Sequence, residues 1–456
     1  MERLVVVGAD AAGMSAASQA RRRRDPEDLS IVAFEKGNYT SYSACGIPYF
    51  VGGLVKDLER LIARTPERFR ESYSIDARVR HEVVDIDLEE RKVTVRDLDE
   101  GTESKEAFDQ LVYSTGSKPI RPALQGAESK GIFGVQILDH GAAIYRELEE
   151  QQPQRAVIVG GGYIGLEMAE AFCMRGLHVS VVEMAAQPMS TLDPDMGDWV
   201  ADAMRSMNID VYTSEPAKAF ESSNGRVEAV VTSERTIPAD IVVLGLGVEP
   251  NTDLAKAAGI PIGPSGAVAV DQQMRTGVDG VWSAGDCAEK FHRVARKPTS
   301  RALGTHANKE GRVAGINLGG GYATFPGIVG TAASKISELE VARTGLKESH
   351  AEEAGFEYVT TIVDSKTRAG YYPGKRPIKT KMIVEKRSGR LLGAQIVGEE
   401  GAAKRIDVLA TALWNEMTVD EMLNVDLSYA PPFAPVWDPV LIAARKAWEL
   451  VEETIH

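Results

Sequence analysis

The chain has 456 residues, enough for two to four domains with substantial cores. Hydrophobic residues make up 43% and charged residues 26%, as in ordinary globular proteins, and the net charge of −14 argues against a general nucleic-acid or membrane role. No apolar run approaches the ~20 residues of a membrane span, and the N-terminus enters a strand at once, so we expect no signal peptide. Three widely spaced cysteines indicate neither a disulfide framework nor a metal site, which favours the reducing cytoplasm.

The first stretch has the pattern of a nucleotide-binding unit. The sequence LVVVG predicts a strand followed by a turn with Gly8 and Gly13, a helix over about 14–23, and a strand, LSIVAFE, that ends at Glu35. Backbone N–H groups at such a turn receive a pyrophosphate, and the terminal acid binds ribose hydroxyls. Asp10 stands where the middle glycine normally lies. We therefore expect its side chain to turn away or to bind water.

A basic run, Arg21 to Arg24, falls at the end of this first helix. Cations there complement the helix dipole, and the alternative is an anchor for a phosphate-bearing substrate.

A lone cysteine, Cys45, follows in the stretch SYSACGIPYF and is expected close behind the bound dinucleotide. It has no partner, because position 50 is Phe50 and the only other cysteines are Cys173 and Cys287. A single thiol in this place forms a mixed disulfide with a small thiol or passes through a sulfenic acid. The alternative is a small buried hydrophobic residue, which we also expect for Cys173 and Cys287.

The pattern of strand, glycine turn, helix, strand and acid occurs a second time. The stretch RAVIVGGGYIGLEMAEAFCMRG holds Gly160, Gly162 and Gly165 at the three glycine positions, and HVSVVE ends at Glu183. One glycine fingerprint is weak evidence, but two copies, each with its acid ~20 residues further on, are much stronger. The chain therefore predicts two dinucleotide-binding units.

Later segments complete the first unit. The stretch VYSTGSKP predicts a short strand that ends at Thr115 and Gly116, and GVWSAGDCAE predicts a strand whose end presents Asp286. A carboxylate there can bond a ribityl hydroxyl, with the next helix N-terminus aimed at a flavin. The stretch DIVVLGLGVEPN is expected to return the chain to the first unit. From about residue 325 the pattern becomes strands (YVTTIVD, KTKMIVEK, LLGAQIVG) and then helices, which is typical of an α+β module.

Together these motifs resemble the pyridine nucleotide–disulfide oxidoreductases over essentially the whole chain. The resemblance implies an α/β fold with two Rossmann-like domains, for FAD and NAD(P)H, and a C-terminal α+β dimerisation domain. The expected boundaries are 1–118 with 241–322 for FAD, 119–240 for NAD(P)H and 325–456 for dimerisation. The single-cysteine branch fits best, and within it the coenzyme A disulfide reductases.

Three features favour that side of the branch. Ala11 stands where peroxidases and water-forming oxidases of the family carry a histidine, and DLSYAPPFAPVWDP replaces the His-Pro catalytic segment of the glutathione reductases. Tyr429 in that segment and Tyr371 in AGYYPGK, with Tyr372 less favoured, match tyrosines that act as acid catalysts from the partner subunit. The third feature is the set of matches to coenzyme A contacts, namely Ser15, Gln19, Arg22, Ser41 and Asn308. Two departures stand against it, since Ala44 replaces an asparagine and Tyr73 a lysine, and both of those normally contact coenzyme A.

The resemblance also implies the cofactor contacts. On the FAD side these are Gly8, Ala12, Gly13, Glu35, Lys36, Val83, Thr115, Gly116 and Asp286. On the NAD(P)H side they are Gly160, Gly162, Tyr163, Ile164, Gly165, Glu167, Glu183 and Gly247. Tyr163 resembles the aromatic gate over the flavin, with a packed helix residue as the alternative, and Glu167 an acid that orients the nicotinamide or a flavin-facing lysine. The residues after Glu183, MAAQ, offer no cation to a 2′-phosphate, so NADH is expected in preference to NADPH.

These matches predict reduction of coenzyme A disulfide or a related small disulfide through Cys45, with coenzyme A as a candidate adduct on its sulfur. A nearby helix N-terminus is expected to lower the Cys45 pKa, and Tyr429 or Tyr371 to protonate the leaving thiol. A homodimer follows if the tyrosines come from a partner subunit, with Trp414, Trp437 and Trp448 as candidate anchors. His306 is a further candidate flavin contact, whereas a core role is the alternative for both tyrosines.

Other functions remain open from the sequence. An NADH oxidase acting through a Cys45 sulfenic acid, an NADH-dependent persulfide reductase, and a redox sensor or electron-transfer flavoprotein are the competing hypotheses. We expect no metal, nucleic-acid or membrane partner.

Overall fold

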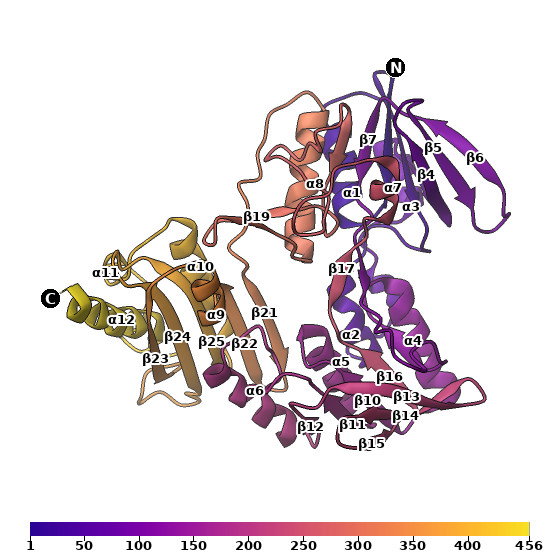
Figure 1. The fold of residues 1–456 in the computed structure, drawn as a ribbon. Helices are drawn as coiled ribbons and strands as arrows, with labels where there is room; N and C mark the ends of the chain where they lie inside the picture. Colours follow the sequence, from indigo (N-terminus) through magenta and orange to yellow (C-terminus); the bar gives the residue numbers. More distant parts are fainter. Residues whose placement is uncertain (456) are drawn as a thin grey trace.

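The computed structural model describes residues 1–455 and builds the N-terminal part around a parallel five-stranded sheet (Figure 1). The sheet has the order β18-β7-β1-β2-β3, with strands β1 (Glu2–Val7), β2 (Leu29–Glu35), β3 (Asp76–Val79), β7 (Gln110–Tyr113) and β18 (Val281–Ser283). Successive side chains of β1 point to opposite faces of the sheet, and each face packs against a different layer. Leu4 and Val6 join the core that holds α1 (Ala11–Arg21) and α8 (Gly304–Leu318), whereas Val5 and Val7 pack toward an antiparallel sheet. That sheet consists of β4 (His81–Asp87), β5 (Lys92–Asp97) and β6 (Glu103–Ala107).

A second parallel sheet forms the nucleotide unit in the middle of the chain, in the order β12-β11-β10-β16-β9. Its strands are β9 (Ile132–Gly134), β10 (Arg155–Val159), β11 (His178–Val182), β12 (Asp210–Tyr212) and β16 (Ile241–Leu244). Its helices are α4 (Leu138–Gln151), α5 (Tyr163–Met174) and α6 (Pro194–Ser206), and β13 (Ala217–Ser223), β14 (Arg226–Thr232) and β15 (Thr236–Pro238) form an antiparallel sheet beside it.

One expected boundary is wrong here. The segment 241–244 was expected to begin the return to the first unit, but β16 pairs in parallel with β10, Ala156 opposite Ile241, at the centre of the second sheet. The return follows at β17 (Val248–Pro250), which pairs with β8 (Ser117–Pro119) in a two-stranded connection between the units.

The C-terminal part is an antiparallel five-stranded sheet in the order β21-β22-β25-β24-β23. Its strands are β21 (Ala332–Ile336), β22 (Leu339–Gly345), β23 (Tyr358–Lys366), β24 (Pro377–Glu385) and β25 (Leu391–Gly398). The sequence patterns predicted the last three. The helices that pack with this sheet are α9 (Glu348–Glu353), α10 (Ile406–Trp414), α11 (Val419–Met422) and α12 (Pro439–Ile455).

Short elements connect these units. They are the 3-10 turns η1 (Ala44–Gly46), η2 (Leu58–Leu61) and η3 (Ala403–Arg405), the helices α2 (Ile47–Val51), α3 (Pro66–Tyr73) and α7 (Asp253–Ala258), and the hairpin β19 (Lys290–His292) with β20 (Lys297–Thr299). Among residues 1–455, no helix is long and apolar enough to cross a membrane.

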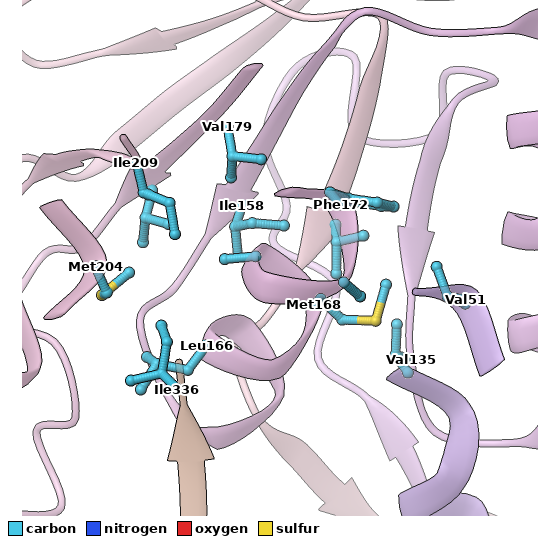
Figure 2. Packing of buried hydrophobic residues seen from close by; sticks show 14 of the residues in the cluster. Val51, Val135, Ile158, Leu166, Met168, Phe172, Val179, Met204, Ile209 and Ile336 are labelled. Atoms are coloured by element: carbon cyan, nitrogen blue, oxygen red, sulfur yellow. The ribbon is translucent and has the colours of Figure 1, made fainter. Parts of the chain in front are cut away.

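The helix α5 ties the three parts together. Figure 2 shows Leu166 of α5 beside Ile336 of β21, and Met168 and Phe172 on the side toward Val51 of α2. The segment that carries Cys45, the second nucleotide unit and the C-terminal sheet therefore share one apolar core.

A buried ion cluster joins the second unit to the C-terminal sheet. The Lys381 side chain of β24 is 1% exposed and lies 3.2 Å from Asp193, 2.7 Å from Asp195 and 2.7 Å from Glu348. Several carboxylates around one ammonium compensate its desolvation, so the cluster fixes how α6 sits against the sheet.

Candidate active site

Cys45 lies in the turn η1 immediately before α2. The turn is tight, because a Cβ atom on Gly46 would come within 2.3 Å of Leu61 Cδ2. At its other end α2 is held to α5, where Arg175 Nε donates to the Val51 carbonyl oxygen at 2.6 Å. The Cys45 side chain is exposed, so a short, anchored segment presents the thiol to incoming molecules.

Within residues 1–455 the three cysteines are all free thiols, and Cys45 has no partner for a disulfide. Phe50 occupies the place of a second cysteine and stacks on Tyr145, with ring centroids 4.7 Å apart. Cys173 is half-buried on α5, and the buried Cys287 thiol lies among backbone carbonyls. Cys45 is the exposed one of the three.

The expectation that the Cys45 pKa is lowered is wrong, because the protein groups around the thiol raise it. Partial desolvation, followed by the carboxylates of Glu167 and Asp286, raises the pKa of Cys45. The helix that follows is only five residues long, so its dipole does not offset two acids. A thiolate here needs positive charge or electron acceptance from a bound group.

The first glycine turn has the shape of a dinucleotide cradle. Gly8 has a φ of +95°, and a Cβ atom there would meet the Ser114 carbonyl oxygen at 2.3 Å, whereas one on Gly13 would meet the Gly8 oxygen at 2.0 Å. Glu35 accepts hydrogen bonds from the backbone N–H groups of Ala9 and Gly37 at 3.0 and 2.9 Å. Strand, turn and acid are thus locked together, which suits a ribose and pyrophosphate.

Asp10 turns away from the bare end of α1, as expected. Its Oδ1 accepts a hydrogen bond from the Tyr42 backbone N–H at 3.1 Å and does not cap the helix. Burial, with a contribution from Glu35, raises the pKa of Asp10 to about 7. Partial protonation at neutral pH reduces the repulsion that a fixed carboxylate would exert on a pyrophosphate.

Asp286 lies just after strand β18, and residues from two other segments hold its side chain. Its Oδ2 accepts from Ser117 Oγ at 2.9 Å and from Gln136 Nε2 at 3.3 Å. Burial raises the pKa of Asp286, and Lys290 opposes that shift. Thr115 Oγ1 donates to the Asn251 carbonyl oxygen.

The other expected FAD contacts surround this turn. Gly116 has a φ of +68° with open space at its Cβ position, and the buried Ala12 is backed by Gly285, whose Cβ would lie 2.8 Å from the Ala12 methyl. Val83 of β4 is 8% exposed, whereas Lys36 is exposed just after Glu35.

A buried ion pair beneath this turn was not predicted from the sequence. Lys290 and Glu310, both with 0% exposed side chains, lie 3.3 Å apart, and Glu310 Oε2 accepts the Gly285 N–H at 2.8 Å. Glu310 follows His306 by one turn of α8, and the buried His306 Nδ1 has no hydrogen-bond partner in the described part of the chain. Nothing in the sequence around Lys290 and Glu310 indicated that these two charged residues are buried.

The second turn repeats the first. Gly160 has a φ of +103°, and Cβ atoms on Gly160 and Gly165 would lie 2.5 Å from the Gly245 oxygen and 2.0 Å from the Gly160 oxygen, respectively. Glu183, 8% exposed, accepts from the Gly161 and Ala185 N–H groups, both at 2.7 Å. Both cradles therefore fit a dinucleotide pyrophosphate.

Tyr163 begins α5 directly after Gly162 and is half-buried, with the half-buried Ile164 beside it. Its hydroxyl accepts a hydrogen bond from Arg343 Nε at 3.3 Å. Glu167, one turn on, accepts from Ser334 Oγ at 3.0 Å, and burial raises the pKa of Glu167. Gly247, with a φ of +87°, lies at the return to the first unit, where its oxygen accepts the Ile120 N–H.

Two of the candidate substrate residues, Ser15 of α1 and Asn308 of α8, contact each other. Ser15 Oγ donates to Asn308 Oδ1 at 3.0 Å. Gln19 Oε1 accepts from Arg23 at 3.1 Å, and Arg22 is exposed at the end of α1. Ser41, with a φ of +49°, lies in the loop before Cys45.

The basic run has mostly structural partners, as the dipole interpretation favours. Arg21 donates to four backbone carbonyls, including that of Tyr73 at 3.1 Å, and Arg24 pairs with Glu2 at 2.7 Å. Arg64 lies over the Tyr73 ring at 5.5 Å. It brings a cation next to the position where Tyr73 replaces the expected lysine.

The two candidate acid catalysts meet in space although 58 positions separate them in the chain. Tyr371 and Tyr429 are exposed on one face, and the Tyr371 hydroxyl raises the pKa of Tyr429. Arg405 holds their loops together by donating to the carbonyl oxygens of Thr367 and Phe433 at 2.9 and 2.8 Å.

Trp414 and Trp437 are exposed, whereas Trp448 packs into its own domain's core. The exposed pair therefore suits an interface better than Trp448 does.

Family comparisons agree with this geometry. Residues 2–311 match the pyridine nucleotide-disulphide oxidoreductase family, and residues 331–439 match its dimerisation domain. An NAD(P)H coenzyme A polysulfide/persulfide reductase of Pyrococcus horikoshii is 36% identical over 97% of this chain and 98% of its own. An NADH oxidase of Methanocaldococcus jannaschii is 36% identical over 98% of both chains, and a coenzyme A disulfide reductase of Staphylococcus epidermidis is 30% identical over 98% and 100%.

Among solved structures, an NAD-dependent persulfide reductase from A. fulgidus superposes with a TM-score of 0.95 at 38% identity. The match covers 99% of this chain and 84% of that one. The expected fold, with two dinucleotide-binding domains and a C-terminal dimerisation domain, is confirmed. The chain therefore belongs to the pyridine nucleotide-disulphide oxidoreductase family, as a flavin-dependent enzyme of its disulfide reductase class.

Proposed function

We propose that this protein uses NADH to reduce coenzyme A disulfide, or a related small disulfide, through a mixed disulfide on Cys45. The observation that carries the proposal is a single exposed thiol, in an anchored turn, without a second cysteine to resolve it. Such a thiol retains half of the substrate between turnovers. Bound FAD would supply two-electron transfer between the nicotinamide and sulfur, and Gly8, Gly13, Glu35 and Asp286 would hold it.

The protein's own residues define the steps at sulfur. The Cys45 thiolate attacks one sulfur of the substrate disulfide, forming a new S–S bond while the substrate S–S bond breaks and the second thiolate leaves. A tyrosine hydroxyl protonates that thiolate. Cleavage of the mixed disulfide by two electrons and one proton, which bound NADH and FAD would supply, releases the second thiol and restores the Cys45 thiolate.

A homodimer supplies the tyrosines in this proposal. Tyr371 lies in the connection between β23 and β24, and Figure 1 draws these strands well apart from α2, the helix that follows Cys45 in the chain. One chain therefore does not bring its own tyrosines to its own thiol. The dimerisation domain and the exposed apolar side chains Phe433, Val436 and Trp437 support delivery from a second copy.

The proposal extends to the coenzyme A site and to the choice of nucleotide. Ser15 and Asn308 lie together between α1 and α8, the exposed Arg22 follows at the end of α1, and the exposed Arg64 is available for a phosphate. Glu183 has a backbone donor on each oxygen, and a 2′-phosphate would meet this fixed carboxylate. This favours NADH.

A turnover assay with matched variants tests the proposal. NADH oxidation is followed anaerobically with coenzyme A disulfide, glutathione disulfide or a polysulfide as acceptor, in wild type and in Cys45→Ser, Tyr429→Phe, Tyr371→Phe and Tyr372→Phe. We expect coenzyme A disulfide to be the best acceptor, Cys45→Ser to be inactive, and Tyr429→Phe or Tyr371→Phe to lose ~10²-fold or more. Tyr372→Phe is the control and stays near wild type. Activity of Cys45→Ser with any disulfide would contradict the proposal.

A persulfide acceptor is the second candidate. Ala44 and Tyr73 depart from the coenzyme A disulfide reductase pattern, and the relatives from Pyrococcus and A. fulgidus carry persulfide reductase names. A polysulfide turned over faster than coenzyme A disulfide would select this function. For the oxidase, Ala11 packs among the small residues Ala12, Ala284 and Ala307 and offers no base for peroxide chemistry.

A further inference from the structure

Two arginines from different parts of the chain meet beside Tyr163. Arg343 of β22 is 8% exposed, and its Nε donates to the Tyr163 hydroxyl at 3.3 Å. Arg301, between β20 and α8, has a buried Nε without a hydrogen-bond partner among the residues that the structure describes. The two are close enough for Arg343, together with burial, to lower the pKa of Arg301.

Neither arginine of this pair has a counter-ion in the part of the chain that the structure describes. Among residues 1–455, none of the ion pairs within 4 Å involves Arg301 or Arg343. The two nearby imidazoles carry no negative charge; burial and the two arginines lower the pKa of His292 to about 4 and contribute to lowering that of His350, so both rings stay neutral at neutral pH. Glu167, one helical turn after Tyr163, accepts a hydrogen bond from Ser334 Oγ at 3.0 Å and forms no ion pair with either arginine among the described residues. Burying a charge without compensation destabilises the fold. We therefore look for a functional role that explains why both arginines are placed here.

The location of the pair indicates that function. Tyr163 follows the glycine turn of the second cradle directly, and under the proposed function the nicotinamide lies at this end of the dinucleotide. The nicotinamide ring is uncharged in NADH and carries a positive charge in NAD⁺. A fixed positive potential therefore acts against the product and leaves the reactant almost unaffected.

We propose that Arg301 and Arg343 are specificity-determining residues that make the nucleotide site beside Tyr163, as placed by the proposed function, favour reduced over oxidised nicotinamide. The inference rests on the proposed use of NADH and deepens it. One unit charge about 10 Å away, at an effective dielectric constant near 20, changes a dissociation constant by roughly tenfold. Weaker binding of NAD⁺ would speed its release after hydride transfer.

Calorimetric titration of the oxidised holoenzyme with NAD⁺ and with ADP-ribose tests this inference without turnover. ADP-ribose has the same phosphates and riboses but lacks the nicotinamide ring. For Arg343→Met and for Arg301→Met we expect NAD⁺ to bind roughly tenfold tighter, with the ADP-ribose Kd unchanged. Arg343→Lys keeps the charge and should behave as wild type. Lys256→Met, which removes an exposed cation of α7, is the matched control and should change neither ligand.

The outcomes separate this inference from the proposed function. A wild-type enzyme whose flavin is not bleached by NADH refutes the use of NADH itself. If NADH bleaches the flavin, an unchanged NAD⁺ affinity in both methionine variants, or an equal change for NAD⁺ and ADP-ribose, overturns the inference. An Arg343→Lys variant that behaves like Arg343→Met also overturns it, because hydrogen-bond geometry rather than charge would then be responsible.

Discussion

The Lys290–Glu310 pair predicts a large and specific loss of stability when one partner is removed. Both side chains are fully buried, 3.3 Å apart. The Lys290 ammonium also donates to the carbonyl oxygens of Gly285 and Ala288 at 2.8 and 2.9 Å, and Glu310 accepts the Gly285 N–H at 2.8 Å. In Lys290→Met, Glu310 is left without a countercharge in a place where burial already raises its pKa.

Breaking a buried pair from one side costs ~3–5 kcal/mol. The double variant Lys290→Met/Glu310→Gln has no charge to desolvate, so it should recover part of that loss despite two missing hydrogen bonds worth ~1 kcal/mol each. The control Lys118→Met breaks an exposed pair with Asp253 and should cost below ~1 kcal/mol.

Urea unfolding followed by flavin fluorescence measures these costs, because the Gly285 turn carries Asp286 and its distortion releases FAD. We expect the order Lys290→Met least stable, the double variant intermediate, and Lys118→Met near wild type. If Lys290→Met unfolds together with Lys118→Met, or if the double variant is the least stable, the electrostatic reasoning is refuted.

Three further predictions follow from the site. Glu183→Ala should raise kcat/KM for NADPH relative to NADH by about 5- to 150-fold, since ~1–3 kcal/mol of charge repulsion and ribose bonding is removed; an unchanged ratio would mean that another residue selects the nucleotide. The Glu167 carboxylate raises the pKa of Cys45, so Glu167→Gln should move the pH profile of Cys45 alkylation by iodoacetamide to lower pH. Glu170→Gln should leave the profile unchanged, and identical profiles for the two variants would contradict this. Asp10 gains charge as pH rises through about 7, so FAD affinity should fall above pH 7 in wild type and stay flat in Asp10→Asn, as measured by FAD titration of apoprotein.

The raised pKa of Asp10 also makes the stability of the folded protein depend on pH. A carboxyl whose folded pKa lies above its unfolded value is most stabilising at low pH, and its contribution is lost as pH rises through the folded value. Asp10, Glu35 and Asp286 all belong to this group. The cradle without FAD should therefore loosen toward neutral pH, and a bound dinucleotide has to outweigh that loss.

Periodic and glycine-rich segments were predictable from the sequence. The two glycine turns need positive φ and close backbone approach at Gly8 and Gly160, which only glycine supplies without strain, so their spacing marks the fold directly. Strands such as β2 and β25 are mostly apolar and stand out as buried strands. The assignment of 241–244 failed because an apolar run does not state which of two parallel sheets it joins.

Electrostatics at the site was the least predictable part. The sequence favoured a lowered Cys45 pKa from a helix, but α2 is short, and Glu167 arrives from a different domain. The meeting of Tyr371 with Tyr429 and of Arg301 with Arg343 depends on tertiary packing between segments far apart in the chain. Local pattern carries no information about such long-range neighbours.

The mass of the intact, non-reduced protein, compared with a reductant-treated sample, tests the central claim most directly. The account predicts a Cys45 peptide that carries one coenzyme A, with loss of two hydrogens on forming the S–S bond, and that loses it on reduction or on addition of NADH. A Cys45 found bare or singly oxygenated, and still unmodified after incubation with coenzyme A disulfide, would contradict it.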